Sequence, residues 1–198
     1  FYAALGFAVL TKGPVGLVLP GGILFFFLLS VGRLREVLLE CRLIPGILVF
    51  SAVALPWYIL EFMANGQEFF DAFFVKHNFM RYTGVNSGHQ GPLYFFIPII
   101  LLGFFPWSAF FPWAVGRVFR PSLFRSFRER PREEQMPLFA GIWFLVVFVF
   151  FSLSGTKLPG YILPLFPAMA ILVGWWWTDG GSQKKIGAAT LVGIGIVF

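Results

Sequence analysis

The chain has 198 residues, of which 58% are hydrophobic and 20% aromatic, and its mean hydropathy is +0.81. Charged residues make up 12% of the chain, about half the share of a typical soluble domain, which excludes a soluble globular fold. The net charge of +6 does not indicate a nucleic-acid partner, because the basic residues lie in short segments between apolar runs.

The apolar runs are long and continuous, so they predict an all-α, polytopic transmembrane helical bundle rather than the alternating strands of a membrane barrel. A spanning helix needs about twenty apolar residues. We expect about five complete spans, at residues 14–31, 43–62, 92–116, 137–152 and 159–177. Apolar runs at residues 1–10 and from 186 onward predict two truncated spans, so the chain is expected to be an internal fragment of a longer protein.

Prolines within these runs predict bends, because proline removes a helical hydrogen bond. We expect a kink at Pro56, near the far end of its span, and bends in residues 92–116 at Pro98, Pro106 and Pro112.

Two connecting segments are long enough to carry structure of their own. Residues 63–91 predict an outer-face interfacial loop, in which aromatic and charged residues recur at helical spacing from Phe69 to Tyr82. This pattern is typical of an amphipathic helix lying in the membrane interface, although a surface helix that only caps the bundle would look the same. Residues 117–135 hold six arginines and predict a basic cytoplasmic loop.

The basic residues fall into two sets once consecutive spans alternate in direction. Eleven lie in loops on one face, which the positive-inside rule makes cytoplasmic, and we interpret them as topology anchors. The other four face the periplasm or its equivalent, in segments that also hold His77 and His89: Lys12, Lys76, Arg81 and Lys157.

These four outward-facing cations predict an anionic ligand. A single lysine at this depth could simply extend its ammonium group to the interface. Several cations around one pocket repel each other unless an anion is bound. A phosphate or pyrophosphate on an isoprenoid tail would fit, with Lys and Arg binding the head and the Phe-rich spans holding the tail.

A metal site is only weakly indicated. His77 and His89 are two imidazoles without a third ligand implied by their spacing, although Glu61, Glu68 or Asp71 could complete a site, so a divalent metal is left open. The sequence contains no Gly-rich nucleotide loop, catalytic-triad spacing or haem motif.

Five blocks of sequence resemble, in the same order, the bacterial aminoarabinose transferase family, which is related to the protein O-mannosyltransferases and shares their GT-C membrane fold. The blocks are LTKGPVGLVLP, ALPWYILEF, FFVKHNFMRYTG, HQGPLYFFIPIILLGFFPW and FSLSGTKLPGYILPLFPA.

The resemblance implies an inverting transfer of a sugar from a polyprenyl-phosphate donor to a lipid A-like or protein acceptor, at the periplasmic face of the bacterial inner membrane. It assigns the donor phosphate or its cavity to Lys12, Arg81, Lys157 and Tyr161, while His77 and His89 fall in matched blocks without a settled role. The family's acidic catalytic residue is expected upstream of these residues, so no catalytic residue is assigned.

Two other classes of protein stay open. A transporter or flippase for a lipid-linked anion is disfavoured, because its ionisable residues would lie near the bilayer midplane, whereas here they gather at one face. A structural membrane subunit would give the same composition without any ligand.

Overall fold

Residues 1–80, 82, 91–179 and 187 are described by the structure, which is a computed structural model. The regular secondary structure of this described part is helical throughout, in agreement with the all-α prediction. The chain divides into two compact units, one made of Phe1–Gly91 with Ser154–Lys157 and the other of Pro92–Leu153 with Leu158–Phe198.

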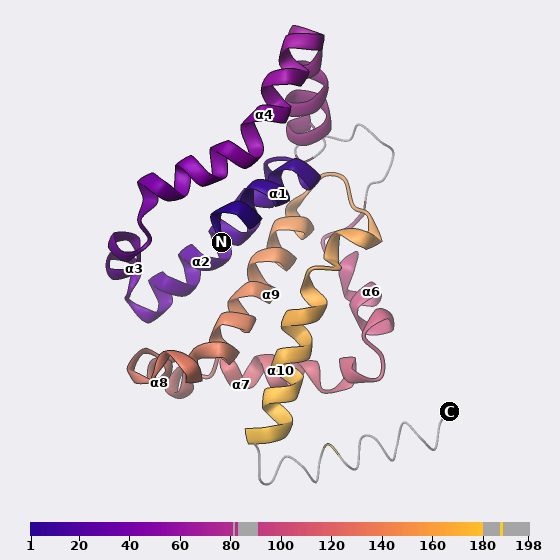
Figure 1. The fold of residues 1–198 in the computed structure, drawn as a ribbon. Coiled ribbons are helices and arrows are strands. Elements are labelled where there is room, and N and C mark those ends of the chain that lie inside the picture. Colours follow the sequence, from indigo (N-terminus) through magenta and orange to yellow (C-terminus); the bar gives the residue numbers. More distant parts are fainter. Residues whose placement is uncertain (81, 83–90, 180–186, 188–198) are drawn as a thin grey trace. The chain divides into compact units, whose positions relative to one another are not determined.

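The first unit begins with a pair of apolar helices joined by a short turn (Figure 1). Gly13 ends α1 with a φ of 68°, a value that glycine adopts without strain, and its N–H donates to the carbonyl of Val9 (2.8 Å). The helices of this unit are α1 (Tyr2–Lys12), α2 (Val15–Val31), α3 (Leu34–Glu40), α4 (Leu43–Phe70) and the π-helix η1 (Asp71–Met80).

Helix α1 packs against both α2 and α4. The approach to α4 is close because a glycine faces the helix: a Cβ at Gly46 would overlap the ring of Tyr2. The hydroxyl of Tyr2 donates to the carbonyl of Cys41 (2.7 Å), just before α4 begins. Two helices far apart in sequence are thereby held together at one end.

Helix α4 folds back on itself at Gly66. This residue has a φ of 55° and a ψ of −134°, well outside the helical range. In an unbroken helix Trp57 and Phe73 would lie about 24 Å apart, whereas their ring centroids are 6.2 Å apart. Pro56, where the sequence predicts a kink, lies inside α4, and the backbone dihedral angles depart from helical values at Gly66.

Residues 63–91 are more regular than the predicted interfacial loop. Helix α4 continues to Phe70 and η1 extends the helical backbone to Met80, so the helix expected from Phe69 onward is present. The remainder of that segment, apart from Tyr82 and Gly91, lies outside the described residues.

The second unit is centred on two apolar helices, α9 and α10, which pack against each other through fully buried side chains such as Leu138, Met169 and Leu172. The ring of Phe111 packs on that of Phe144 at a centroid distance of 4.7 Å. The elements of this unit are α6 (Phe96–Gly103), η2 (Trp107–Ala109), α7 (Phe111–Val118), α8 (Pro121–Glu129), η3 (Arg132–Gln135), α9 (Met136–Leu153), η4 (Pro159–Ile162) and α10 (Leu165–Asp179).

The predicted span at residues 92–116 is not a single helix. It is divided into α6, the 3-10 turn η2 and α7, with Pro106 immediately before η2 and Pro112 in the first turn of α7. The hydroxyl of Ser108 donates to the carbonyl of Leu101 (2.8 Å), which supplies a hydrogen bond where the helix is interrupted. Two of the three expected proline bends therefore coincide with breaks, while Pro98 lies within α6.

Three helical stretches in the described part of the chain are long and apolar enough to cross a membrane: Leu43–Lys76, Arg132–Leu153 and Pro159–Thr178. They contain the predicted spans at residues 43–62, 137–152 and 159–177. Helices α1 and α2 are shorter apolar helices. The truncated span expected from residue 186 lies outside the described residues.

Candidate functional site

Lys157 lies at the end of a tight turn, Ser154–Lys157, and its side chain is buried, with 6% of the residue exposed. Its Nζ donates to the carbonyl of Ser154 (2.7 Å), and the hydroxyl of Ser154 donates to the carbonyl of Thr156 (3.0 Å). An ammonium group has three N–H donors, and this hydrogen bond accounts for one of them. Among the described residues no carboxylate forms a salt bridge with Lys157.

A buried cation of this kind is costly unless an anion or further acceptors compensate its charge. The sequence alone left open that Lys157 simply extends its ammonium group to the membrane interface. The buried side chain of Lys157 does not fit that alternative. Its environment is chemically suited to an anionic ligand.

The turn that carries Lys157 is joined to the 63–91 segment at Tyr82. The N–H of Gly155 donates to the carbonyl of Tyr82 at 2.7 Å, a backbone bond between two distant sequence blocks of the same unit. Arg81, the chain neighbour of Tyr82, lies outside the described residues, as does His89.

Lys12 has different surroundings. It is the last residue of α1 and is exposed. Its positive charge interacts favourably with the partial negative charge at the C-terminal end of the helix. Both lysines belong to the first unit.

A tyrosine that sequence reasoning did not select ties the Lys12 turn to α4. The hydroxyl of Tyr58 donates to the carbonyl of Val9 (3.0 Å), the same oxygen that accepts from Gly13 at the end of α1. The ring of Tyr58 also packs on Phe73 and Phe74 of η1, with centroid distances of 5.7 and 5.9 Å. A hydroxyl within an apolar span needs a partner, which is the signal that could have identified Tyr58.

These contacts connect four of the five sequence blocks within one unit. Tyr58, in the block of α4, shares the Val9 carbonyl with Gly13 of the first block. The aromatic fold-back links α4 to the block of η1, and Tyr82 of that same block is bonded to Gly155 of the Lys157 turn. A series of hydrogen bonds and ring contacts therefore runs through the first unit from the end of α1 to the turn that carries Lys157.

Tyr161 belongs to the second unit, in the 3-10 turn η4. Its ring is half-buried and packs on that of Phe151 of α9, with centroids 5.1 Å apart. The position of Tyr161 is therefore set by its contact with the C-terminal end of α9.

The residues considered for a metal do not form a ligand set in the described part of the chain, where no group of three His, Cys, Asp or Glu side chains could hold an ion. The carboxylate of Glu61 accepts from the amide of Asn65 (2.7 Å) and that of Asp71 from the amide of Gln67 (3.4 Å). His77 lies in η1, but its side chain, like all of His89, is outside the described structure.

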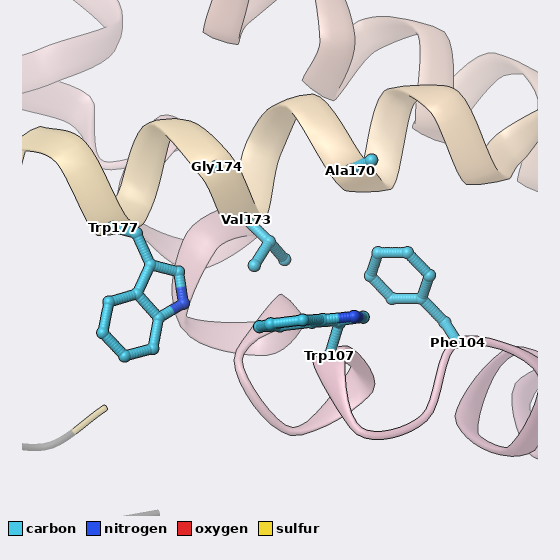
Figure 2. A pocket seen from close by; sticks show the side chains of 6 residues that line it. All are labelled: Phe104, Trp107, Ala170, Val173, Gly174 and Trp177. Carbon is cyan, nitrogen blue, oxygen red and sulfur yellow. The ribbon is translucent and has the colours of Figure 1, made fainter. Parts of the chain in front are cut away.

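An apolar cavity of about 630 Å³ opens beside α10 in the second unit (Figure 2). Its walls are aromatic and aliphatic, so it suits a hydrocarbon chain rather than a sugar. Tyr161 is not among the residues that line this cavity. The lining residues are Phe104, Trp107, Ala170, Val173, Gly174 and Trp177.

The helices and their apolar surfaces define the chain as part of an α-helical membrane protein. No family model matches the sequence. The undecaprenyl phosphate-alpha-4-amino-4-deoxy-L-arabinose arabinosyl transferase 2 of Proteus mirabilis is 31% identical over 98% of the chain and 33% of its own length. The corresponding transferase of Pseudomonas paraeruginosa is 33% identical over 86% of the chain and 29% of its own length.

The fold is matched as well. The crystal structure of ArnT from Cupriavidus metallidurans bound to undecaprenyl phosphate superimposes with a TM-score of 0.80 and 34% identity, over 99% of the chain and 33% of that protein. The chain is thus a homologue of these bacterial arabinosyl transferases, which confirms the resemblance carried by the five sequence blocks. It spans about a third of the length of these relatives.

Proposed function

We propose that this chain is the donor-phosphate-binding part of an integral-membrane glycosyltransferase, which moves a sugar from a polyprenyl-phosphate donor to a lipid A-like or protein acceptor. The observation that carries the proposal is the buried Lys157, whose ammonium group has one described hydrogen bond and no described carboxylate partner. The relative from Cupriavidus metallidurans was crystallised with undecaprenyl phosphate, a ligand of this chemistry.

Lys157 would bind the phosphate of the donor. A phosphate oxygen accepts strong, charge-assisted hydrogen bonds from an ammonium group, and the bond to Ser154 orients Nζ before the ligand arrives. We assign Arg81 and Lys12 to the same phosphate or the rim of its cavity, and Tyr161 to the cavity wall. His77 and His89 have no assigned step.

The proposed reaction is an inverting displacement. The acceptor oxygen attacks the anomeric carbon, the bond between that carbon and the phosphate oxygen breaks, and the lipid phosphate leaves with the electron pair. Lys157 stabilises the negative charge that develops on this leaving group, where a preorganised cation is most effective. A hydroxyl acceptor would lose its proton to a base, which we do not assign to any residue of this chain.

The remaining features of the proposal follow the family. We expect a GT-C-type helical bundle in the bacterial inner membrane, with about five complete and two truncated spans in this part and the site facing the periplasm. The four outward-facing cations against eleven on the other face support this orientation.

Substitution of Lys157 tests the proposal in the full-length protein. In detergent, with a polyprenyl-phosphate-linked sugar and lipid A as substrates, Lys157→Gln should lower the transfer rate by about 100-fold or more, the usual loss when one preorganised donor to a developing charge is removed. Lys157→Arg should retain part of the activity, because it keeps the charge but not the geometry. Transfer in detergent also separates an enzyme from a flippase, which needs a sealed compartment.

The matched control is Arg35→Gln, which removes one exposed cation from α3. It should leave the transfer rate unchanged. A folded Lys157→Gln variant, with the thermal midpoint of the unmodified protein and its full transfer rate, would overturn the role of Lys157.

A further inference from the structure

A second basic site lies in the other unit, where α7 meets α8. A cavity of about 350 Å³ is open on this surface, and its lining combines two arginines with an aromatic and two small apolar residues. These residues are Pro112, Trp113, Gly116, Arg117 and Arg120.

The two arginines lie close together in the chain where α7 ends. Arg117 is in the last turn of α7, Arg120 follows two residues after its end, and the N–H of Arg120 donates to the carbonyl of Arg117 (3.2 Å). The guanidinium carbon of Arg117 lies 5.1 Å from the ring centroid of Trp175 on α10, a cation–π contact that fixes its position. Arg120 is exposed, at the residue that precedes α8.

The surroundings reinforce the positive charge. No acidic residue is among those that line the cavity. Along the same segment Arg130 is neutralised by Glu134 (3.6 Å) and packs over Phe127, but Arg125 and Arg128 are exposed on α8. Two cations around one cavity with no acid in its lining favour an anionic occupant.

The apolar part of the lining distinguishes a lipid from a free anion. Trp113 exposes 62% of its surface beside the arginines, and indole rings of this kind are enriched at the level of the lipid headgroups. The apolar cavity of Figure 2 is lined by Gly174 and Trp177, which lie within two residues of the Trp175 that contacts Arg117, so hydrocarbon-compatible surface lies at the same end of α10.

We propose that this cavity binds the headgroup phosphate of an anionic phospholipid, with Arg117 and Arg120 contacting the phosphate and Trp113 packing at the headgroup level. Basic pockets between membrane helices are suited to such headgroups, and arginine can bind a phosphate in a bidentate geometry. The arginines at this junction would then hold a specific lipid in addition to setting the orientation of the chain.

Native mass spectrometry of the full-length protein in detergent tests this site, with phosphatidylglycerol as the titrated lipid. Arg120→Gln should weaken phosphatidylglycerol binding about fivefold, the effect expected for one basic residue at an anionic lipid surface. Arg128→Gln removes the same charge from an exposed position on α8 outside the cavity, so its effect should stay below about twofold. Phosphatidylcholine should bind the unmodified protein no more tightly than it binds the Arg120→Gln variant, because it carries no net negative charge.

Two outcomes would overturn the site. Equal losses in the Arg120→Gln and Arg128→Gln variants would mean that the lipid responds only to the overall charge of the surface. Displacement of phosphatidylglycerol by millimolar inorganic phosphate would identify a free anion as the ligand instead of a lipid. The readout is lipid binding, so it is independent of whether the protein transfers a sugar.

Discussion

Gly46 of α4 faces the first residue of α1, Tyr2. A Cβ at this position would overlap the ring of Tyr2, whose hydroxyl also donates to the carbonyl of Cys41. Gly46→Ala should therefore force α1 and α4 apart and destabilise the protein by about 1–3 kcal/mol, the usual cost of overpacking. Thermal unfolding in detergent measures this loss.

Gly21→Ala is the matched control, because Gly21 also lies within an apolar helix but a Cβ there meets nothing within 4 Å. It should be neutral or stabilising by up to about 1 kcal/mol, since alanine is the better helix former. Equal thermal midpoints for the two variants would show that α1 and α4 are not in close contact at Gly46.

The two lysines of the candidate site show what the residue types could and could not predict. Lys12 and Lys157 both occupy short connections between apolar helices, so the sequence predicted one role for both. In the structure Lys157 is buried with its Nζ on the carbonyl of Ser154, while Lys12 is exposed at a helix end. The difference arises from backbone carbonyl positions, which have no signature in the residue types.

The fold-back between α4 and η1 depends on one backbone conformation. Gly66 has a φ of 55° and a ψ of −134°, and a Cβ there would meet nothing within 4 Å. Any effect of Gly66→Ala must therefore come from backbone strain, which is worth about 1–3 kcal/mol at such an angle. We expect a lower thermal midpoint for Gly66→Ala, with Gly21→Ala again as the control. An unchanged midpoint would mean that the segment can straighten without cost.

Helix boundaries were predictable where apolar runs are long and continuous. The predicted spans at residues 43–62, 137–152 and 159–177 correspond to candidate membrane helices. About twenty apolar residues in a row are the length that a membrane-spanning helix needs, so such runs indicate one directly. The break of residues 92–116 into α6, η2 and α7 was less predictable, since prolines within membrane helices are tolerated in many places. Of its three prolines, Pro98 remains inside a helix, and the sequence alone did not distinguish it from Pro106 and Pro112.

Long-range contacts were not predictable at all. The N–H of Gly155 donates to the carbonyl of Tyr82. Both groups belong to the backbone, so the residue types at these positions carry no signal for the bond. The order of the sequence blocks indicated that these segments are related, but the physical connection between them depends on how the first unit folds. The same holds for Tyr58, whose hydroxyl reaches the end of α1.

The distribution of charge over the whole molecule predicts its orientation in the membrane. The sequence assigns eleven basic residues to one face and four to the other, so the positive-inside rule predicts that Lys12 is outside and Arg128 is in the cytoplasm. Both residues are exposed. In a background in which Cys41, the one cysteine of this chain, and any cysteine elsewhere in the protein are replaced by Ser, Lys12→Cys should react with a membrane-impermeant maleimide in intact spheroplasts.

Arg128→Cys should react with the same reagent only after the membrane is permeabilised, and the cysteine-free background should stay unlabelled in both conditions. This pair of variants bears directly on the proposed chemistry, because a donor phosphate bound near Lys12 must be reached from the outer leaflet. Labelling of Arg128→Cys in intact spheroplasts, with Lys12→Cys protected, would invert the topology. The Lys157 site would then face the cytoplasm, and a periplasmic acceptor would have to be abandoned.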